Sequence, residues 1–167
     1  AWHREAAQRL LYERQDKSAV PLLGKLLRDA PSALGRMHAL CTLDGLSALT
    51  QSDLLAALND QAGNVREQGV RLTEKFVKDK SAAGNPVFKK LLALTSDPDP
   101  LVRYQLAFTL GEFQGPDRIK ALAEIALRDG ESRWVQAAIL SSLAEGAGDL
   151  FAALSGDPLI RDAKAGQ

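Results

Sequence analysis

The sequence contains few of the residues on which small catalytic or disulfide-stabilised proteins depend. Its 167 residues include one cysteine, Cys41, and two histidines, His3 and His38. A single cysteine excludes an intrachain disulfide framework, and a structural zinc site normally needs four cysteine or histidine ligands. Phosphate-binding glycine loops, nucleophile elbows and paired metal carboxylates are also missing. We therefore expect no catalytic, cofactor or metal site, and we predict that the chain is not an enzyme.

Two further absences limit the class of partner. The 21 basic and 21 acidic residues give a formal net charge of zero, whereas a dedicated nucleic-acid-binding protein usually carries a basic excess. No run of 18 or more apolar residues occurs, so we expect no membrane insertion. No small-molecule site is evident in the sequence. The expected partner is therefore another protein, or a neighbouring domain of a larger parent chain.

The composition favours α-helices. Hydrophobic residues make up 46% and charged residues 25% of the chain, as in globular proteins. Aromatic residues reach only 5%, β-branched residues are sparse, and alanine and leucine dominate the apolar set. Because alanine and leucine are strong helix formers, the chain is predicted to be all-α.

A helical pattern recurs along the chain at intervals of 30 to 37 residues. The segments that share it align on Arg4, Arg36, Arg66, Arg103 and Gln136. Apolar or small residues follow each of these positions at spacings of three, four and seven, which mark one face of a helix. Leu40, Leu110 and Leu143 are among the side chains that this register assigns to the core. Before each such helix lies a shorter amphipathic segment, so every unit is a helix pair.

Stacked helix pairs bury a shared core that one pair cannot bury alone. The predicted fold is an α-α superhelix, a right-handed solenoid of antiparallel helix pairs formed by residues 1–167 as a single domain. About five repeats are expected, with approximate bounds 18–49, 51–78, 85–114 and 117–147 and partial repeats at 1–15 and 148–167. Asn85 and Asp99 are predicted helix caps before prolines, and Ser52 and Asp149 are further cap candidates.

The stretch DPDPLVRYQLAFTLG, residues 97–111, resembles HEAT repeats of a short variety. The tetratricopeptide alternative has a suitable period, but its W-x-x-L-G-x-x-Y pattern is missing, as is the ankyrin T-P-L-H. The resemblance implies an armadillo-like helical array that acts in protein–protein interaction.

A narrower resemblance covers about the first half of the chain. WHREAAQRLLYERQDKSAVPLLGKLL and ALGRMHALCTLDGL are similar to the HEAT-repeat region of large planctomycete-type exported dehydrogenase and c-type cytochrome proteins. The absence of C-x-x-C-H means that the haem domain of such a protein is not represented. Because the chain opens in mid-helix and stops within a repeat, we expect a fragment of a longer protein. The resemblance implies an exported or periplasmic location; without it, a cytoplasmic one is expected.

His38 and Cys41 are three residues apart, on adjacent turns of one helix face. Such a pair suggests either a cysteine–histidine dyad or half a metal site, or else a core thiol beside a partly exposed histidine. The second interpretation is favoured because no further cysteine exists.

The arginines that recur in register could bind phosphates or carboxylates, or could bond the preceding turn or an aspartate of a neighbouring repeat. The structural interpretation is favoured, because a repeated residue usually serves the repeat. The stretch 71–90 carries six basic residues against two acidic ones, which suggests nucleic-acid binding as an alternative function. That stretch lacks interleaved aromatics for base stacking, so an ordinary solvated loop is favoured.

The leading functional hypothesis is a non-catalytic protein-binding or spacer module, part of a larger protein, that uses the curved surface of stacked helices. Tyr104 and Trp134 are predicted in the first turns of their helices, near the surface, where aromatics serve as binding hot spots. They could equally seal the seam between repeats. The predicted partner-binding residues are Tyr104, Trp134, His38 and Arg71.

Overall fold

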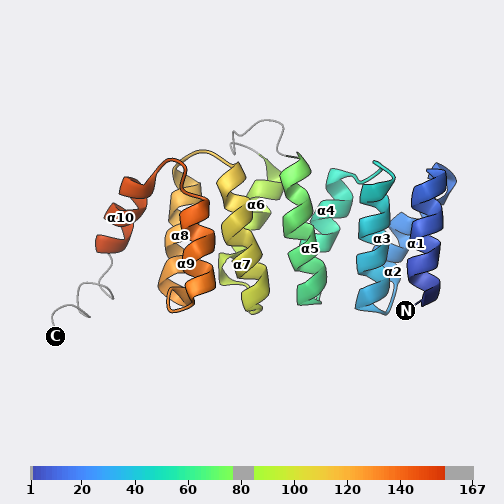
Figure 1. The fold of residues 1–167 in the computed structure, drawn as a ribbon, viewed down its shortest axis with the longest axis horizontal. Coiled ribbons are helices and arrows are strands. Elements are labelled where there is room, and N and C mark those ends of the chain that lie inside the picture. Colours follow the sequence, from blue (N-terminus) through green and yellow to red (C-terminus); the bar gives the residue numbers. More distant parts are fainter. Residues whose placement is uncertain (1, 77–84, 157–167) are drawn as a thin grey trace. The chain divides into compact units, whose positions relative to one another are not determined.

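The computed structural model describes residues 2–76 and 85–156. Within these two ranges the chain forms α-helices and short 3-10 helices and no β-strand (Figure 1). It divides into two compact units, Ala1–Phe76 and Val77–Gln167, which we call unit 1 and unit 2. None of the helices in the described ranges is long and apolar enough to cross a membrane.

Unit 1 consists of two layers of helices. Helices α1 (Trp2–Arg14), α3 (Ala33–Gly45) and α5 (Gly63–Thr73) follow one another in one layer, and α2 (Val20–Asp29) and α4 (Gln51–Leu58) form the other (Figure 1). The short 3-10 helices η1 (Lys17–Ala19) and η2 (Glu74–Phe76) precede α2 and follow α5. Each pair, α2 with α3 and α4 with α5, packs across the layers.

Unit 2 repeats this plan. Helices α7 (Pro100–Thr109) and α9 (Arg133–Ser141) pack side by side in one layer, while α8 (Pro116–Asp129) packs against both α6 (Pro86–Ala93) and α10 (Ala147–Ser155) in the other. Short 3-10 turns, η3 (Leu94–Ser96) and η4 (Leu110–Glu112), extend α6 and α7. The expected all-α helical-repeat architecture is thus confirmed, whereas the expected repeat boundaries stay predictions.

The helix caps were predicted correctly where an asparagine or aspartate precedes proline. The Asn85 side chain accepts hydrogen bonds from the N–H groups of Val87 and Phe88, and Asp99 accepts one from Leu101. These bonds satisfy N–H groups that the first helical turn leaves without partners.

The other two cap candidates were wrong. Ser52 lies inside α4, which Thr50 caps instead through a capping box with Asp53. Asp149 lies in the first turn of α10, whose N-cap is Gly146 in the left-handed conformation at φ 89°. A glycine tolerates this backbone conformation because it has no Cβ.

The register correctly predicted burial at most of its aligned positions. Leu40 and Leu110 are fully buried, together with Val70, Leu106 and Ala107 from the same aligned positions. Leu143, which follows the end of α9, is only half-buried. The register was wrong for Leu140, the last of the aligned residues four after the anchor, which is 70% exposed.

Close helix packing explains the small residue at one aligned position. A Cβ added to Gly69 of α5 would lie 3.1 Å from the Ala57 Cβ and 3.3 Å from the backbone nitrogen of Leu58, both in α4. A larger side chain would therefore push α4 and α5 apart. This agrees with the expectation that small residues at this register position let neighbouring helices approach.

Leu110 and Leu140 provide a matched pair for testing the core. We expect Leu110→Ala to destabilise the protein by roughly 3 kcal/mol, because it removes buried apolar surface and leaves a cavity. Leu140→Ala removes the same atoms from an exposed side chain, and we expect it to change stability by less than about 0.5 kcal/mol. Urea unfolding followed by circular dichroism measures both. Equal effects for the two variants would contradict the packing described here.

Candidate functional site

Four of the five aligned anchor residues bond the turn that precedes their helix. Arg36 Nη1 donates to the Ala30 carbonyl oxygen at 2.7 Å, and Arg66 Nη1 donates to the Asp60 carbonyl at 2.8 Å. Arg103 Nη1 makes the same bond to the carbonyl of Asp97. Gln136, which stands in place of arginine at the fifth aligned position, donates from Nε2 to the Gly130 carbonyl at 2.6 Å. In each case the acceptor lies six residues before the donor, at the turn between the paired helices.

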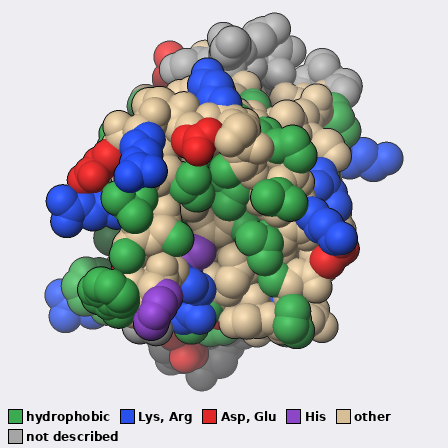
Figure 2. All heavy atoms as spheres, turned by 90° about the vertical axis from the view of Figure 1, so that its right-hand side faces the viewer, with side chains coloured by type: hydrophobic (Ala, Val, Ile, Leu, Met, Phe, Trp, Pro, Cys, Tyr) green, Lys and Arg blue, Asp and Glu red, His purple; other side chains and the backbone are tan. Residues whose placement is uncertain are grey.

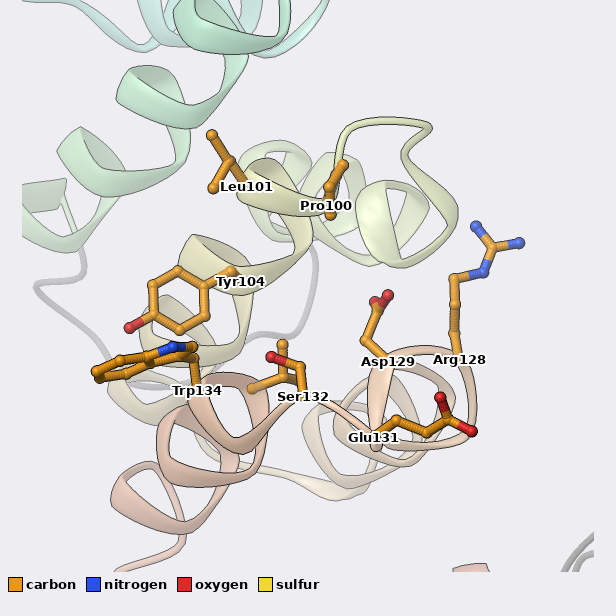
Figure 3. Close-up of a pocket in the computed structure, with 9 residues that line it drawn as sticks. Pro100, Leu101, Tyr104, Arg128, Asp129, Glu131, Ser132 and Trp134 are labelled. Atoms are coloured by element: carbon orange, nitrogen blue, oxygen red, sulfur yellow. The ribbon is translucent and has the colours of Figure 1, made fainter.

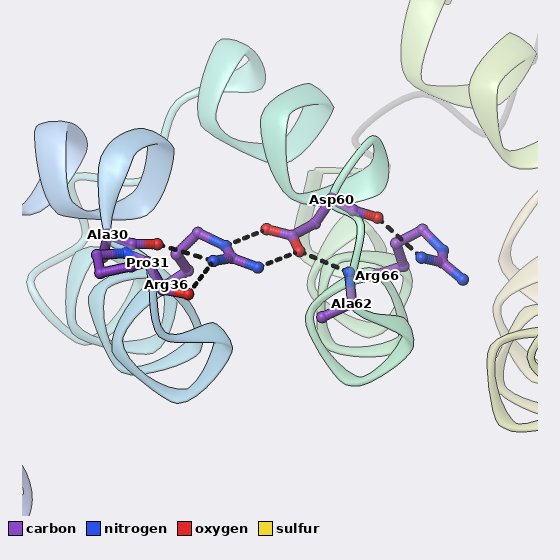
Figure 4. Close-up of polar contacts among 6 residues, drawn as sticks. All are labelled: Ala30, Pro31, Arg36, Asp60, Ala62 and Arg66. Carbon is purple, nitrogen blue, oxygen red and sulfur yellow. Dashed lines mark hydrogen bonds and ion pairs between the residues drawn. The ribbon is translucent and has the colours of Figure 1, made fainter.

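Two of these arginines also bridge consecutive helix pairs. Arg36 Nε and Nη2 lie 2.6 and 2.7 Å from the carboxylate oxygens of Asp60, which belongs to the turn between α4 and α5 (Figure 4). In unit 2, Arg103 Nε and Nη2 both lie 2.6 Å from the oxygens of Asp129, the last residue of α8. We call these the Arg–Asp links.

The Arg–Asp links confirm the structural interpretation of the recurring arginines. The side chains of Arg36 and Arg103 are only 5% and 9% exposed, and both guanidinium groups are occupied by protein acceptors. Neither is therefore accessible to a phosphate from solution. Arg4 in α1 is exposed and makes no such link within the described residues.

The links shift the pKa values of Arg36, Arg103 and Asp60. Hydrogen bonding to Asp60 raises the pKa of Arg36, and hydrogen bonding to Asp129 raises that of Arg103. For Asp60, burial acts to raise the pKa. The hydrogen bonds from Arg36 and the Ala62 N–H, with the positive charges of Arg36 and Arg66, outweigh burial and lower it below its ordinary value.

The structure does not support a Cys41–His38 dyad. The ring nitrogen Nδ1 of His38 lies 2.6 Å from Oε1 of Gln8 in α1, so the imidazole is engaged with a neighbouring helix. Burial raises the pKa of the Cys41 thiol, and the negative charge of Asp44 raises it further. An activated thiol needs the opposite shift. Among residues 2–76 and 85–156, no group of three or more histidine, cysteine or acidic side chains is arranged to hold a metal ion.

The basic stretch 71–90 falls on both units. Arg71 is exposed on α5, and the Lys75 amine lies 2.6 Å from a carboxylate oxygen of Asp44. Lys89 and Lys90 belong to α6 in unit 2. The central part of the stretch, with Lys78 and Lys80, lies outside the described residues.

Tyr104 and Trp134, predicted as partner-binding residues, line one open pocket in unit 2. The pocket has a volume of about 520 Å³ and lies between the N-terminal parts of α7 and α9 and the α8–α9 turn. Trp134 is 75% exposed, and Figure 3 shows its indole beside the phenol ring of Tyr104. Tyr104 was expected in the first turn of α7 but lies in the second. Its ring packs edge-to-face against that of Phe108, with the ring centroids 5.1 Å apart.

The other two predicted partner residues, His38 and Arg71, lie in unit 1 and do not line this pocket. Sequence reasoning missed the remaining lining residues: Pro100, Leu101, Arg128, Asp129, Glu131, Ser132 and Val135. Leu101 offered a signal in the sequence, because it is a large apolar residue outside the apolar register of α7. In the structure its side chain is 58% exposed. The other two large aromatic side chains do not line the pocket. Phe88 is buried and packs against Phe113, with the ring centroids 4.7 Å apart, and Trp2 is exposed on α1.

Comparison with known proteins identifies the family. A family model of HEAT repeats matches residues 51–144, more than half of the chain. The chain belongs to the HEAT-repeat family. Searches of curated proteins and of solved structures gave no match. HEAT repeats commonly act as protein-interaction scaffolds, and the family is generally non-catalytic.

The Arg36–Asp60 link of this HEAT-repeat protein predicts a pH-dependent loss of stability. Asp60→Asn would leave the buried Arg36 without its counter-charge, and we expect a loss of about 3 kcal/mol at neutral pH. Because the folded pKa of Asp60 is lowered, its contribution is complete above the unfolded pKa of about 3.9. It disappears as the pH falls through the lower, folded value. The difference between wild type and variant should therefore shrink below pH ~4.

Urea midpoints at neutral pH and near pH 3 measure this difference. Glu13→Gln is the control, because its exposed ion pair with Arg9 should contribute little to stability at either pH. A difference between Asp60→Asn and wild type that is independent of pH would refute the role assigned to the charged link.

The raised pKa of Cys41 predicts slow alkylation. At pH 8 the native thiol should react with iodoacetamide several-fold more slowly than the same thiol in urea-unfolded protein, because the thiolate is the nucleophile. His38→Ala should leave the native rate unchanged, since the imidazole is engaged with Gln8. Mass spectrometry of quenched samples gives the rates. Faster reaction in the native state, abolished by His38→Ala, would restore the dyad.

Proposed function

We propose that the chain is a non-catalytic protein-binding module of a larger protein and that the pocket around Tyr104 and Trp134 is its contact site. The exposure of Trp134, at 75%, is the observation that carries this proposal. Leaving an indole in water forgoes a large apolar burial, and tryptophan and tyrosine are the side chains most enriched in binding hot spots. Because Trp134 and Tyr104 come from neighbouring helices of one layer, a single partner can contact both.

The shape of the pocket favours a macromolecular partner over a small molecule. Its lining is mainly apolar, with Pro100, Leu101 and Val135 joining the two aromatic rings, but the pocket is open on its outer side. Sites for small molecules usually enclose most of the ligand surface. An open apolar recess instead suits a side chain or short segment that projects from a protein surface.

A spacer role is the alternative. The similarity of the first half to the HEAT region of exported dehydrogenase and cytochrome proteins would place the chain between two domains of one polypeptide. In that case the neighbouring domains are the partners, and the exported location stays a prediction. The nucleic-acid alternative depends on the basic stretch alone, where Lys75 already pairs with Asp44.

Selection of binding peptides from a random displayed library tests the proposed site. We expect enriched peptides to bind the wild-type protein and to lose roughly tenfold or more in affinity for Trp134→Ala and for Tyr104→Ala, as hot-spot truncation does. Trp2→Ala is the matched control, because Trp2 is equally exposed, at 72%, but lies in unit 1. Parallel substitutions His38→Ala and Arg71→Ala test whether these predicted residues contribute. Peptides that bind all of the aromatic variants equally would refute the site.

A further inference from the structure

The ionisable groups that line the Tyr104–Trp134 pocket are not equally available to a partner. Asp129 holds Arg103 through both carboxylate oxygens. Arg128 extends away from the two rings (Figure 3), and its Nη1 lies 3.3 Å from the carbonyl oxygen of Ser96. Glu131 is exposed and makes no hydrogen bond or ion pair with any of the described residues. The pocket therefore offers a partner one carboxylate, that of Glu131, which forms no ion pair with the described residues.

Negative charge is also in excess behind this carboxylate. The positive charge of Arg103 is stabilised first by Asp129 and then by the carboxylates of Asp97 and Asp99, so three aspartates surround one buried guanidinium. With Glu131 these make four carboxylates near Arg103 and the pocket, against three guanidinium groups, those of Arg103, Arg128 and the exposed Arg133 at the start of α9. Charge complementarity thus favours a positively charged occupant and disfavours an acidic one.

The two rings favour the same kind of occupant. The face of an indole or phenol ring carries the negative part of the aromatic quadrupole and attracts a guanidinium or ammonium group within about 6 Å. Tryptophan is the strongest such partner, and the ring of Trp134 is exposed to solvent. A purely apolar segment would also cover these rings, but it would withdraw the Glu131 carboxylate from water without a partner. Burying an unpaired charge in this way is unfavourable.

We propose that the Tyr104–Trp134 pocket binds a basic segment of a partner protein, with an arginine or lysine side chain lying over the Trp134 ring. A second basic side chain of the same segment pairs with the Glu131 carboxylate at the opposite end of the pocket. This inference rests on the proposed function and names the chemistry of the partner: an extended segment with at least two positive charges.

Titration with designed peptides tests the charge requirement. The probes are a short glycine–serine peptide that carries two arginines and the same peptide with citrulline, which keeps the shape of arginine without its charge. The readout is the indole N–H resonance of Trp134 in ¹H–¹⁵N spectra, assigned with Trp134→Phe, and the indole of Trp2 serves as an internal control. We expect a saturable shift of Trp134 alone, with the citrulline peptide about tenfold weaker.

Two isosteric variants separate the role of Glu131 from a general effect of charge. Glu131→Gln should weaken the arginine peptide several-fold and reduce its dependence on salt between about 50 and 200 mM. Glu124→Gln removes the same charge from an exposed position of α8 outside the pocket and should leave the affinity unchanged. Equal affinity for the arginine and citrulline peptides, or equal effects of the two variants, would overturn the inference.

The proposed function and this inference fail in different ways. If library-selected peptides without basic residues bind through Trp134, while the arginine peptide does not shift its indole, the pocket is a protein-binding site for another chemistry. If no peptide of either kind depends on Trp134 or Tyr104, both proposals are wrong.

Discussion

The buried Arg–Asp link between consecutive helix pairs is the interaction on which the architecture depends. Arg36 and Arg103 each bond the turn before their own helix and hold an aspartate of the next helix pair, Asp60 in the α4–α5 turn or Asp129 at the end of α8. A buried guanidinium is tolerated only when a counter-charge and hydrogen-bond acceptors surround it. Since the carbonyl acceptor and the aspartate come from consecutive helix pairs, the link restrains both segments and the spacing of the helices between them.

The same link positions the candidate binding site. Asp129 lines the pocket while its carboxylate holds Arg103, and the residue after Arg103 is Tyr104. Asp129 ends α8, and the short turn that follows leads within a few residues to Trp134. The aromatic side chains are thereby presented by backbone that a buried ion pair restrains. Restrained anchors lose less conformational entropy on binding than mobile ones do.

The parts of the structure that follow from helical periodicity could be predicted from sequence. Leu40 and Leu110 were placed in the core because one face of each second helix repeats at spacings of three, four and seven. Leu140 broke the pattern: its aligned counterpart in α7, Ala107, is fully buried, whereas Leu140 lies next to the end of α9 at Ser141 and is 70% exposed. Helix ends are decided by caps and turns, which is also why Ser52 and Asp149 were wrong as caps and Thr50 was missed.

The candidate site was predictable only in part, for a related reason. Tyr104 and Trp134 could be selected as large side chains near helix starts, but their meeting in one pocket depends on how α7 packs against α9. Glu131 and Asp129 are both acidic residues in the sequence. Only the structure shows that the Asp129 carboxylate holds Arg103, whereas Glu131 makes no bond with the described residues. The spacing of apolar residues predicts which face of a helix is buried. A pairing between side chains of different repeats produces no such spacing in the sequence.

Other parts of the two units are held by different bonds. Arg118 in α8 is buried like Arg103, yet its Nη1 and Nη2 donate to the carbonyl oxygens of Ser142 and Glu145, at 3.2 and 2.7 Å, and its Nε has no partner among the described residues. It therefore secures the end of α9 through backbone acceptors and needs no aspartate at that turn. Ser142 adds to this junction, since its hydroxyl donates to the Ala107 carbonyl at 2.7 Å. Main-chain carbonyls exist at every residue, so such a junction leaves the side chains of its turn free to vary. An Arg–Asp link instead commits an aspartate to the turn, and that aspartate then becomes part of the surface that a partner meets.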